Sequence, residues 1–146
     1  MNKINSFRNE YFFLSNFYNC PVEIEDIRFL NAEAAFQAMK CEEKSDREIF
    51  RNLSASEAKR LGRKVKLRPN WNVLRMKYMK EIILDKFSRN PELRDKLLAT
   101  GNAELIEGNT WNDTFWGINL YTGVGENHLG KILMEVRKEL RNALSK

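Results

Sequence analysis

The C-terminal segment of the chain places the strongest constraint on its fold. Its apolar side chains recur every three or four positions and are Leu129, Ile132, Leu133, Val136, Leu140 and Ala143. Lysine, arginine and glutamate fill most of the positions between them. This spacing puts the apolar side chains on one face of an α-helix, and such a face is stable only when it packs against a hydrophobic core. We therefore expect an amphipathic helix that packs against the rest of the chain.

Further helix signals lie between residues 31 and 101. They are polar N-cap residues at the expected starts, and a proline at the first position of one helix. Asn31 is expected to cap a helix over residues 32–43. Two short helices are expected to start at the capping boxes Ser45–Glu48 and Ser54–Glu57, and two further helices to cover residues 71–88 and 91–101. Gly62 is expected to end the helix that starts at Ser54, because glycine adopts the left-handed conformation beyond a helix end.

The β-structure is expected to be small and near the N-terminus. Val22–Ile24 and Ile27–Phe29 flank Glu25-Asp26, which predicts a short hairpin. Residues 103–121 predict a loop-like segment with one or two strands. No repeat, low-complexity tract or linker is present. We therefore predict one domain over residues 1–146 with a mainly α fold, an α+β arrangement with a small N-terminal β element.

Composition and charge exclude several classes of protein. The chain has 146 residues and a formal net charge of +5, from 25 Lys+Arg and 20 Asp+Glu. Its longest uncharged stretches, residues 11–22 and 114–125, are too short to span a bilayer. Residues 1–10 have no apolar core of a signal peptide. Two cysteines without a CxxC spacing fit a reducing compartment. We expect a cytoplasmic protein without a membrane partner. The positive net charge favours anionic ligands.

The catalytic motifs that depend on histidine, cysteine or a phosphate loop are absent. His128 is the one histidine of the chain, and no serine or cysteine near it has the context of a nucleophile. No cluster of Cys or His predicts a metal site. Residues 125–131 fit GxxxxGK, but Ile132 stands where a phosphate loop needs Ser or Thr. Glycines before a helix N-terminus still expose N–H groups that can hold a phosphate.

The helix expected after Asn31 carries three polar residues on one strip. Glu33, Gln37 and Lys40 follow at spacings of i, i+4 and i+7, next to an apolar face. Glu33 and Lys40 would be about 10 Å apart along the axis, which leaves room for a substrate between them. The alternative interpretation is a solvated polar face.

Residues 107–117 form the second unusual segment. Trp111 and Trp116 flank Asp113 in an expected loop that also contains Glu107. Indole rings stack on nucleobases, and carboxylates stabilise cationic transition states at sugar carbons. The alternative is that both tryptophans belong to the core.

A basic run covers the end of the helix expected to stop at Gly62 and the residues after it. Its members are Lys59, Arg60, Arg63, Lys64, Lys66 and Arg68. Such a run can follow the phosphates of a nucleic acid, or it can be ordinary solvated surface.

Taken together, the motifs resemble one family. The resemblance lies in FLSNFY at 13–18, E-x-x-x-Q-x-x-K at 33–40, LGR at 61–63, Asp113-x-x-Trp116-Gly117, and Gly125-x-Asn127-x-Leu129-Gly130. In this order they resemble the YbiA-like proteins, also called NADAR domains. The similarity extends from about residue 7 to residue 137 and implies a single compact helical domain of this type.

The resemblance implies an N-glycosidase that cleaves the bond between a ribose anomeric carbon and a base nitrogen. Two substrate types are implied: phosphoribosylated pyrimidine intermediates of riboflavin biosynthesis, and ADP-ribosylated guanine, as a small molecule or within a nucleic acid. The family's mechanism implies a lysine that attacks the anomeric carbon to form an imine. No metal and no organic cofactor are needed.

The resemblance also implies roles for individual residues. Lys40 is the expected nucleophile, Glu33 the proton-transfer group, and Asp113 and Glu107 the groups that stabilise the sugar cation. The expected substrate-binding residues are Asn16, Phe17, Gln37, Arg63, Trp111, Trp116 and Asn127. Two alternatives to an enzyme stay open: a module that binds ADP-ribose or another nucleotide without turnover, and a basic module that binds nucleic acid.

Overall fold

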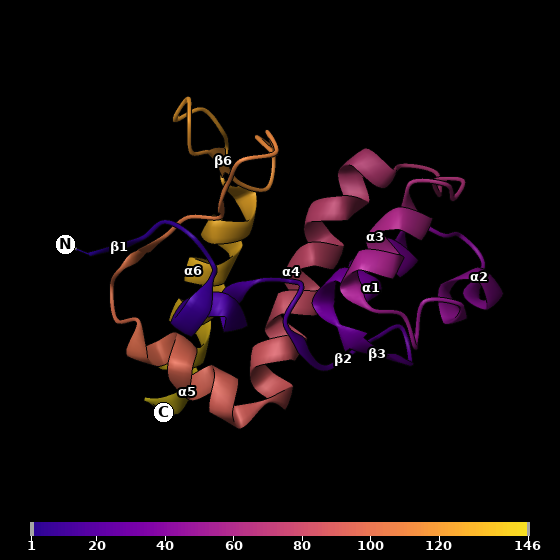
Figure 1. Ribbon diagram of the computed structural model, residues 1–146. Helices are drawn as coiled ribbons and strands as arrows, with labels where there is room; N and C mark the ends of the chain where they lie inside the picture. Colours follow the sequence, from indigo (N-terminus) through magenta and orange to yellow (C-terminus); the bar gives the residue numbers. More distant parts are fainter. Residues whose placement is uncertain (1, 146) are drawn as a thin grey trace. The chain divides into compact units, whose positions relative to one another are not determined.

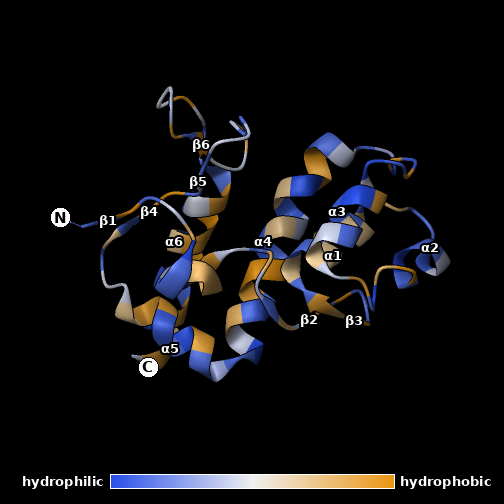
Figure 2. Ribbon diagram, viewed as in Figure 1, coloured by the Kyte–Doolittle hydropathy of each residue, from blue (hydrophilic) through white to orange (hydrophobic). Residues whose placement is uncertain are grey.

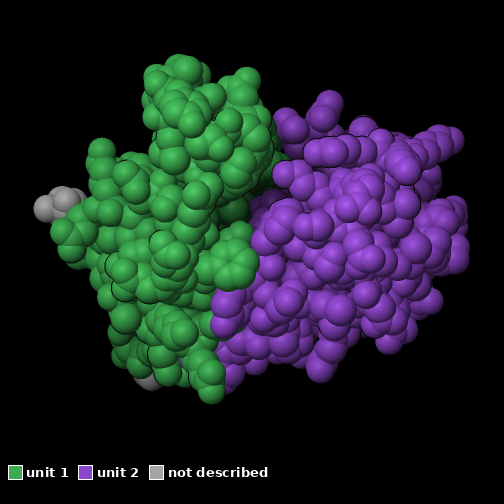
Figure 3. Space-filling view, viewed as in Figure 1, with its two compact units in different colours: residues 1–15, 92–146 green, residues 16–91 purple. Residues whose placement is uncertain are grey.

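The computed structural model describes residues 2–145 (Figure 1). The chain forms two compact units, coloured separately in Figure 3. Unit 1 combines Met1–Ser15 with Glu92–Lys146, and unit 2 is the continuous segment Asn16–Pro91. Helices make up most of the regular structure and all strands are short, so the expected mainly α fold class is confirmed. No helix in the described part of the chain is long and apolar enough to cross a membrane.

Unit 2 contains the expected β-hairpin. Strand β2 (Asn19–Ile24) pairs antiparallel with β3 (Ile27–Asn31), and Val22 lies opposite Phe29. Glu25 and Asp26 both have positive φ, 52° and 63°. Two consecutive left-handed residues match a type I′ turn, whose twist suits the flanking strands. The turn therefore forms without the glycine that usually occurs there.

Helix α1 (Ala32–Met39) is the central helix of unit 2. It packs against the hairpin, α3 (Ala55–Gly62) and α4 (Trp71–Arg89), and every residue of α1 except Glu33 is buried. Hydrophobic and hydrophilic residues alternate along α4 in Figure 2, as its periodicity predicts.

The structure corrects two helix boundaries in unit 2. Helix α1 ends at Met39 and not at Glu43, because Arg68 binds the last carbonyls: its backbone N–H donates to the Lys40 carbonyl at 2.8 Å, and its guanidinium to the Met39 carbonyl at 3.1 Å. Ser45 lies inside α2 (Lys44–Glu48) and does not cap it.

The capping box at Ser54 and Glu57 is confirmed. Gly62, however, keeps a helical conformation, and Arg63 follows as the C-cap. The expectation that Gly62 adopts a left-handed conformation is therefore wrong.

Unit 1 contains helices η1 (Asn9–Leu14), α5 (Pro91–Ala99, from its second residue on) and α6 (His128–Leu144). Strand β1 (Lys3–Ile4) pairs in parallel with β4 (Glu104–Leu105), and β5 (Gly108–Asn109) with β6 (Ile118–Asn119). The apolar face of α6 is buried from Leu129 to Val136, with Leu133 and Val136 inaccessible to solvent, whereas Leu140 is half-buried and Ala143 is exposed. Gly130 lies inside α6, in contact with the Leu105 carbonyl, so residues 125–131 form a helix start and not a phosphate loop.

Candidate active site

Asn31 fixes the start of α1 and thereby the position of its polar strip. Its side-chain oxygen accepts the Ala34 N–H at 2.8 Å, and its amide nitrogen donates to the Leu53 carbonyl at 3.2 Å. Asn31 is fully buried, so both of these bonds replace contacts with water. The helix start is therefore tied to the segment that leads into α3.

Glu33 and Gln37 are joined directly on this strip. The Gln37 amide nitrogen donates to a Glu33 carboxylate oxygen at 2.6 Å. Gln37 is buried and packs on Gly62 of α3, where any Cβ would overlap its side-chain oxygen. One oxygen of the Glu33 carboxylate is thus held by the Gln37 amide, and the contact with Gly62 restricts the rotation of that amide.

Lys40 follows α1 as its C-cap and is half-buried. Burial lowers the pKa of the Lys40 amine, and nearby Arg63 lowers it further, while Glu33 acts in the opposite direction. A lower pKa increases the share of neutral amine at a given pH, and the neutral amine is the nucleophile. These shifts also show that Glu33 and Arg63 are close enough to Lys40 to interact with its charge.

Asn16 and Phe17 lie beside the start of α1. The Asn16 carbonyl accepts the Glu33 N–H at 3.0 Å, and the Asn16 side chain is buried with its amide nitrogen 3.5 Å from the Met79 sulfur. The Lys59 ammonium lies 5.7 Å from the centre of the Phe17 ring. Unit 2 therefore brings together the predicted residues Asn16, Glu33, Gln37, Lys40 and Arg63.

Unit 1 holds the remaining predicted residues, organised around an asparagine that sequence reasoning missed. Asn109 is fully buried, and its amide nitrogen donates to the Glu107 carboxylate at 3.0 Å and to the Asp113 carbonyl at 2.9 Å. Its oxygen accepts the Asp113 N–H at 3.0 Å. Gly117 makes room for this arrangement, because a Cβ there would overlap the Glu107 carboxylate. In the sequence, only the nearness of Asn109 to Glu107 and Asp113 could have indicated that it bonds to both of them.

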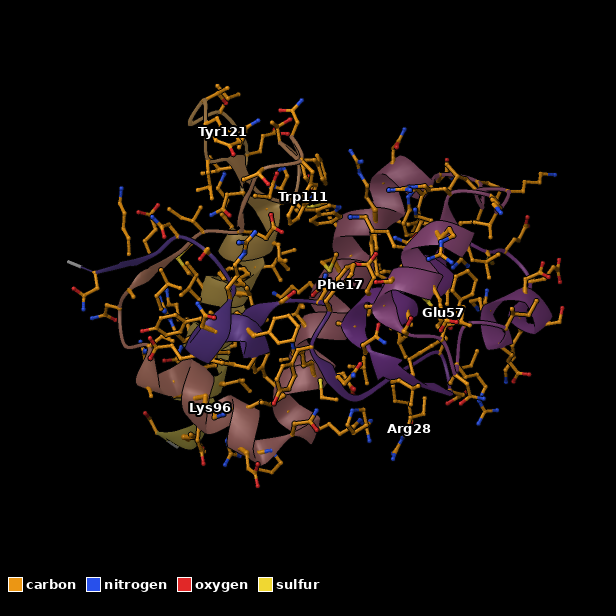
Figure 4. The ribbon with its side chains drawn as sticks, viewed as in Figure 1. Phe17, Arg28, Glu57, Lys96, Trp111 and Tyr121 are labelled. Atoms are coloured by element: carbon orange, nitrogen blue, oxygen red, sulfur yellow. The ribbon has the colours of Figure 1, made fainter. Side chains whose placement is uncertain are left out.

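Asp113 also builds its own turn. One carboxylate oxygen accepts the N–H groups of Phe115 at 3.2 Å and Trp116 at 2.9 Å. The Trp116 ring meets the Phe115 ring edge-on, with 4.7 Å between the centroids. Trp111, in contrast, is 56% exposed on the same loop region (Figure 4). The two tryptophans thus differ: one packs within its turn, and the other is open to solvent.

Asn127 supports Glu107 from the start of α6. Its side-chain oxygen accepts the Glu107 N–H at 2.9 Å, and its amide nitrogen donates to the Leu105 carbonyl at 2.9 Å. Both polar atoms of the side chain are therefore engaged with backbone groups, and the expected contact of Asn127 with a phosphate stays a prediction. Next to it, His128 is the first residue of α6, 3.6 Å from the Glu126 carboxylate. No group of His, Cys, Asp and Glu within residues 2–145 is arranged to hold a metal ion.

Comparison with known proteins settles the family. The model of the NADAR domain matches residues 4–141. The chain belongs to the NADAR family. The solved structure of the protein YbiA from Escherichia coli, determined by NMR, superimposes with a TM-score of 0.88 at 35% identity, over 99% of this chain and 88% of that structure's chain. The resemblance stated from the motifs and the expected fold class are both confirmed.

Curated relatives carry names that describe an activity. The protein named N-glycosidase YbiA from Escherichia coli is 38% identical over 90% of this chain and 83% of its own length. A protein named N-glycosidase from Nostoc punctiforme is 38% identical over 90% of this chain and 86% of its own length. A riboflavin biosynthesis protein from Vibrio vulnificus is 37% identical over 88% of this chain, which covers 35% of that longer protein.

Proposed function

We propose that this NADAR protein is an N-glycosidase that hydrolyses the bond between the anomeric carbon of a ribose and a base nitrogen. The observation that carries the proposal is the placement of Lys40: a half-buried amine of lowered pKa, on the same helical strip as the fixed carboxylate of Glu33. The names of the relatives from Escherichia coli and Nostoc punctiforme support the same reaction class.

The proposed reaction uses the amine of Lys40 as the nucleophile. Its lone pair forms a bond to the anomeric carbon, and the electron pair of the C–N bond leaves with the base, which takes up a proton. Opening of the sugar ring gives an imine between Lys40 and the sugar. Water then adds to the imine carbon, and the sugar leaves as the free amine is restored. Glu33 is the group proposed to move protons in these steps.

The other predicted residues are proposed to bind and stabilise the substrate. Glu107 and Asp113 would stabilise positive charge on the sugar, and Trp111 and Trp116 would stack on the base. For the rest, we propose contacts of Arg63 and Asn127 with phosphate and of Asn16 and Phe17 with the remaining substrate. The resemblance implies Gln37 as a further substrate-binding residue, but its amide is bonded to Glu33, which favours a positioning role. The scheme needs no metal and no organic cofactor.

Two substrate types are proposed. One is a phosphoribosylated pyrimidine intermediate of riboflavin biosynthesis, which the name of the Vibrio vulnificus relative supports. The other is ADP-ribosylated guanine, as a small molecule or linked to a nucleic acid, which the basic residues in the last turn of α3 and after it would favour. A cytoplasmic location is proposed as well, in keeping with Cys20 and Cys41, which are both free thiols.

The proposal is tested by base release from each substrate, followed by chromatography. The purified protein is incubated with either compound beside Lys40→Ala and beside Lys44→Ala, a control at an exposed lysine of α2. Release is expected from one substrate, retained in the control and lost in Lys40→Ala. Borohydride added during turnover should attach the sugar to the wild type and not to Lys40→Ala, because it reduces an imine to a stable amine.

Other outcomes would favour another function. Tight binding of ADP-ribose in calorimetry without base release would favour a binding module. Binding of nucleic acid that falls steeply with salt and persists in Lys40→Ala would favour a basic nucleic-acid module. Full activity of Lys40→Ala would contradict the covalent mechanism.

A further inference from the structure

Gln37 is placed to hold Glu33 rather than to contact a substrate. We infer that Gln37, packed against Gly62, is a positioning residue that fixes the Glu33 carboxylate. Its effect on turnover rests on the proposed glycosidase reaction, whereas its effect on the site itself does not.

The hydrogen bond determines which way the Gln37 amide faces. An ionised carboxylate only accepts hydrogen bonds, so the amide nitrogen has to face Glu33, at 2.6 Å. The side-chain oxygen then faces Gly62, where it is buried and has no hydrogen-bond partner among the described residues. An acceptor without a partner is unfavourable inside a protein. The bond to Glu33 is therefore the interaction that decides this orientation.

The missing side chain of Gly62 leaves the space in which the Gln37 amide takes this orientation. A Cβ on residue 62 would overlap both the oxygen and the carbonyl carbon of the Gln37 side chain. The backbone of Gly62 is helical, so the position does not need glycine for its conformation. It needs glycine for space, and the space is filled by the Gln37 amide. Such close contact prevents the amide from rotating toward a ligand.

The consequence for the site runs through Lys40. Its amine interacts with Glu33 and Cys41 from the α1 side and with Arg63 from the end of α3. Among these, Glu33 raises the pKa of Lys40 and Arg63 lowers it. When the Glu33 carboxylate is released and moves toward solvent, its influence decreases and the pKa of Lys40 falls further. Gln37 and Gly62 therefore help to set both the position of the acid and the protonation of the nucleophile.

The test compares Gln37→Leu and Gly62→Ala with Ala58→Gly. Gln37→Leu removes the donor, and Gly62→Ala displaces the amide without removing a polar group. Ala58→Gly is the matched control, since it weakens the same helix at a buried position and leaves both Gln37 and Gly62 unchanged. Both test variants are expected to lower kcat by about 10²-fold with little change in KM, as a misplaced catalytic group does. The control is expected to keep the kcat of the wild type.

A second measurement does not depend on turnover. The pKa of Lys40 is followed by NMR of its amine in all four proteins, and it is expected to fall in Gln37→Leu and Gly62→Ala and to stay at the wild-type value in Ala58→Gly. A raised KM with unchanged kcat, or an unchanged pKa of Lys40, would overturn the inference. An inactive wild type in which the pKa of Lys40 still responds would refute the proposed function and leave the positioning role intact.

Discussion

Lys86 offers a quantitative test of the forces that act inside unit 2. Its side chain is fully buried, with the ammonium 5.1 Å from the centre of the Phe87 ring and 5.8 Å from that of Tyr18. Burial lowers its pKa from 10.5 to about 8, against a smaller opposing influence of Cys20. Each pKa unit corresponds to about 1.4 kcal/mol, so keeping this charge inside the fold costs about 3 kcal/mol.

Replacement of Lys86 by methionine removes this cost and keeps a long, unbranched side chain. The two cation–π contacts are lost with the charge and offset part of the gain, at about 1 kcal/mol each. Lys86→Met is therefore expected to raise the free energy of unfolding by about 1 kcal/mol at pH 7. Urea denaturation followed by tryptophan fluorescence measures the difference, and Lys138→Met, at an exposed position of α6, is the control.

The pH dependence gives the sharper criterion. Below pH 8 the lysine is protonated in the folded and the unfolded state, so the full cost is present. Between pH 8 and 10.5 the unfolded state binds more protons, and the wild type gains stability as the pH rises. The advantage of Lys86→Met should therefore decrease over this range.

Cys20 titrates nearby, and burial raises the pKa of its thiol, so it acts in the opposite direction above pH 9. The same comparison in a Cys20→Ala background removes this effect. If Lys86→Met is strongly destabilised at pH 7, and the difference does not change up to pH 10.5, the reasoning from burial is wrong.

Three further predictions concern Asn31, Asn109 and Lys40. Asn31→Ala should lower the free energy of unfolding, measured by urea denaturation, by about 2 kcal/mol, because it removes the cap of α1 and the hydrogen bond to Leu53. Asn31→Asp keeps the cap and should lower this free energy by less. Asn109→Ala should lower the melting temperature and the turnover together, because it removes one hydrogen bond of the Glu107 carboxylate and the side-chain partners of two backbone groups of the loop; unchanged turnover would show that Glu107 does not take part in the reaction. The turnover of the wild type should rise with pH to a plateau reached below pH 10.5, because burial lowers the pKa of Lys40; an apparent pKa of 10.5 or above would contradict this.

The elements that local patterns specify could be predicted from the sequence. The apolar spacing of α6 and α4 repeats over several turns, and the hairpin has two β-rich stretches around a two-residue turn. The end of α1 could not be predicted, because it depends on Arg68, a residue far along the chain that binds its last carbonyls. The pairing of β1 with β4 was missed for the same reason: two strands of two residues carry almost no local signal.

The same distinction applies to the site. Helical periodicity alone places Glu33, Gln37 and Lys40 on one strip, so this part could be predicted from spacing. The bonds of Asn109 to Glu107 and Asp113 depend on loop backbone geometry, which no periodicity describes. The role of Gly62 was missed because its reason is a contact between two helices and not its own conformation.

The division of the chain has a consequence for its synthesis on the ribosome. Unit 2 is one continuous segment, so its hairpin and helices can fold as soon as Pro91 has emerged from the exit tunnel. Strand β1 is translated before unit 2, but its partner strand, residues 104 and 105, is translated after unit 2, so β1 stays unpaired during that interval. The first fifteen residues, which include the apolar side chains Phe12 and Phe13, are therefore available to chaperones during that interval. A nascent chain stalled at a length that has just brought Pro91 out of the exit tunnel should show a protease-resistant core that starts near Asn16, with residues before it still cleaved.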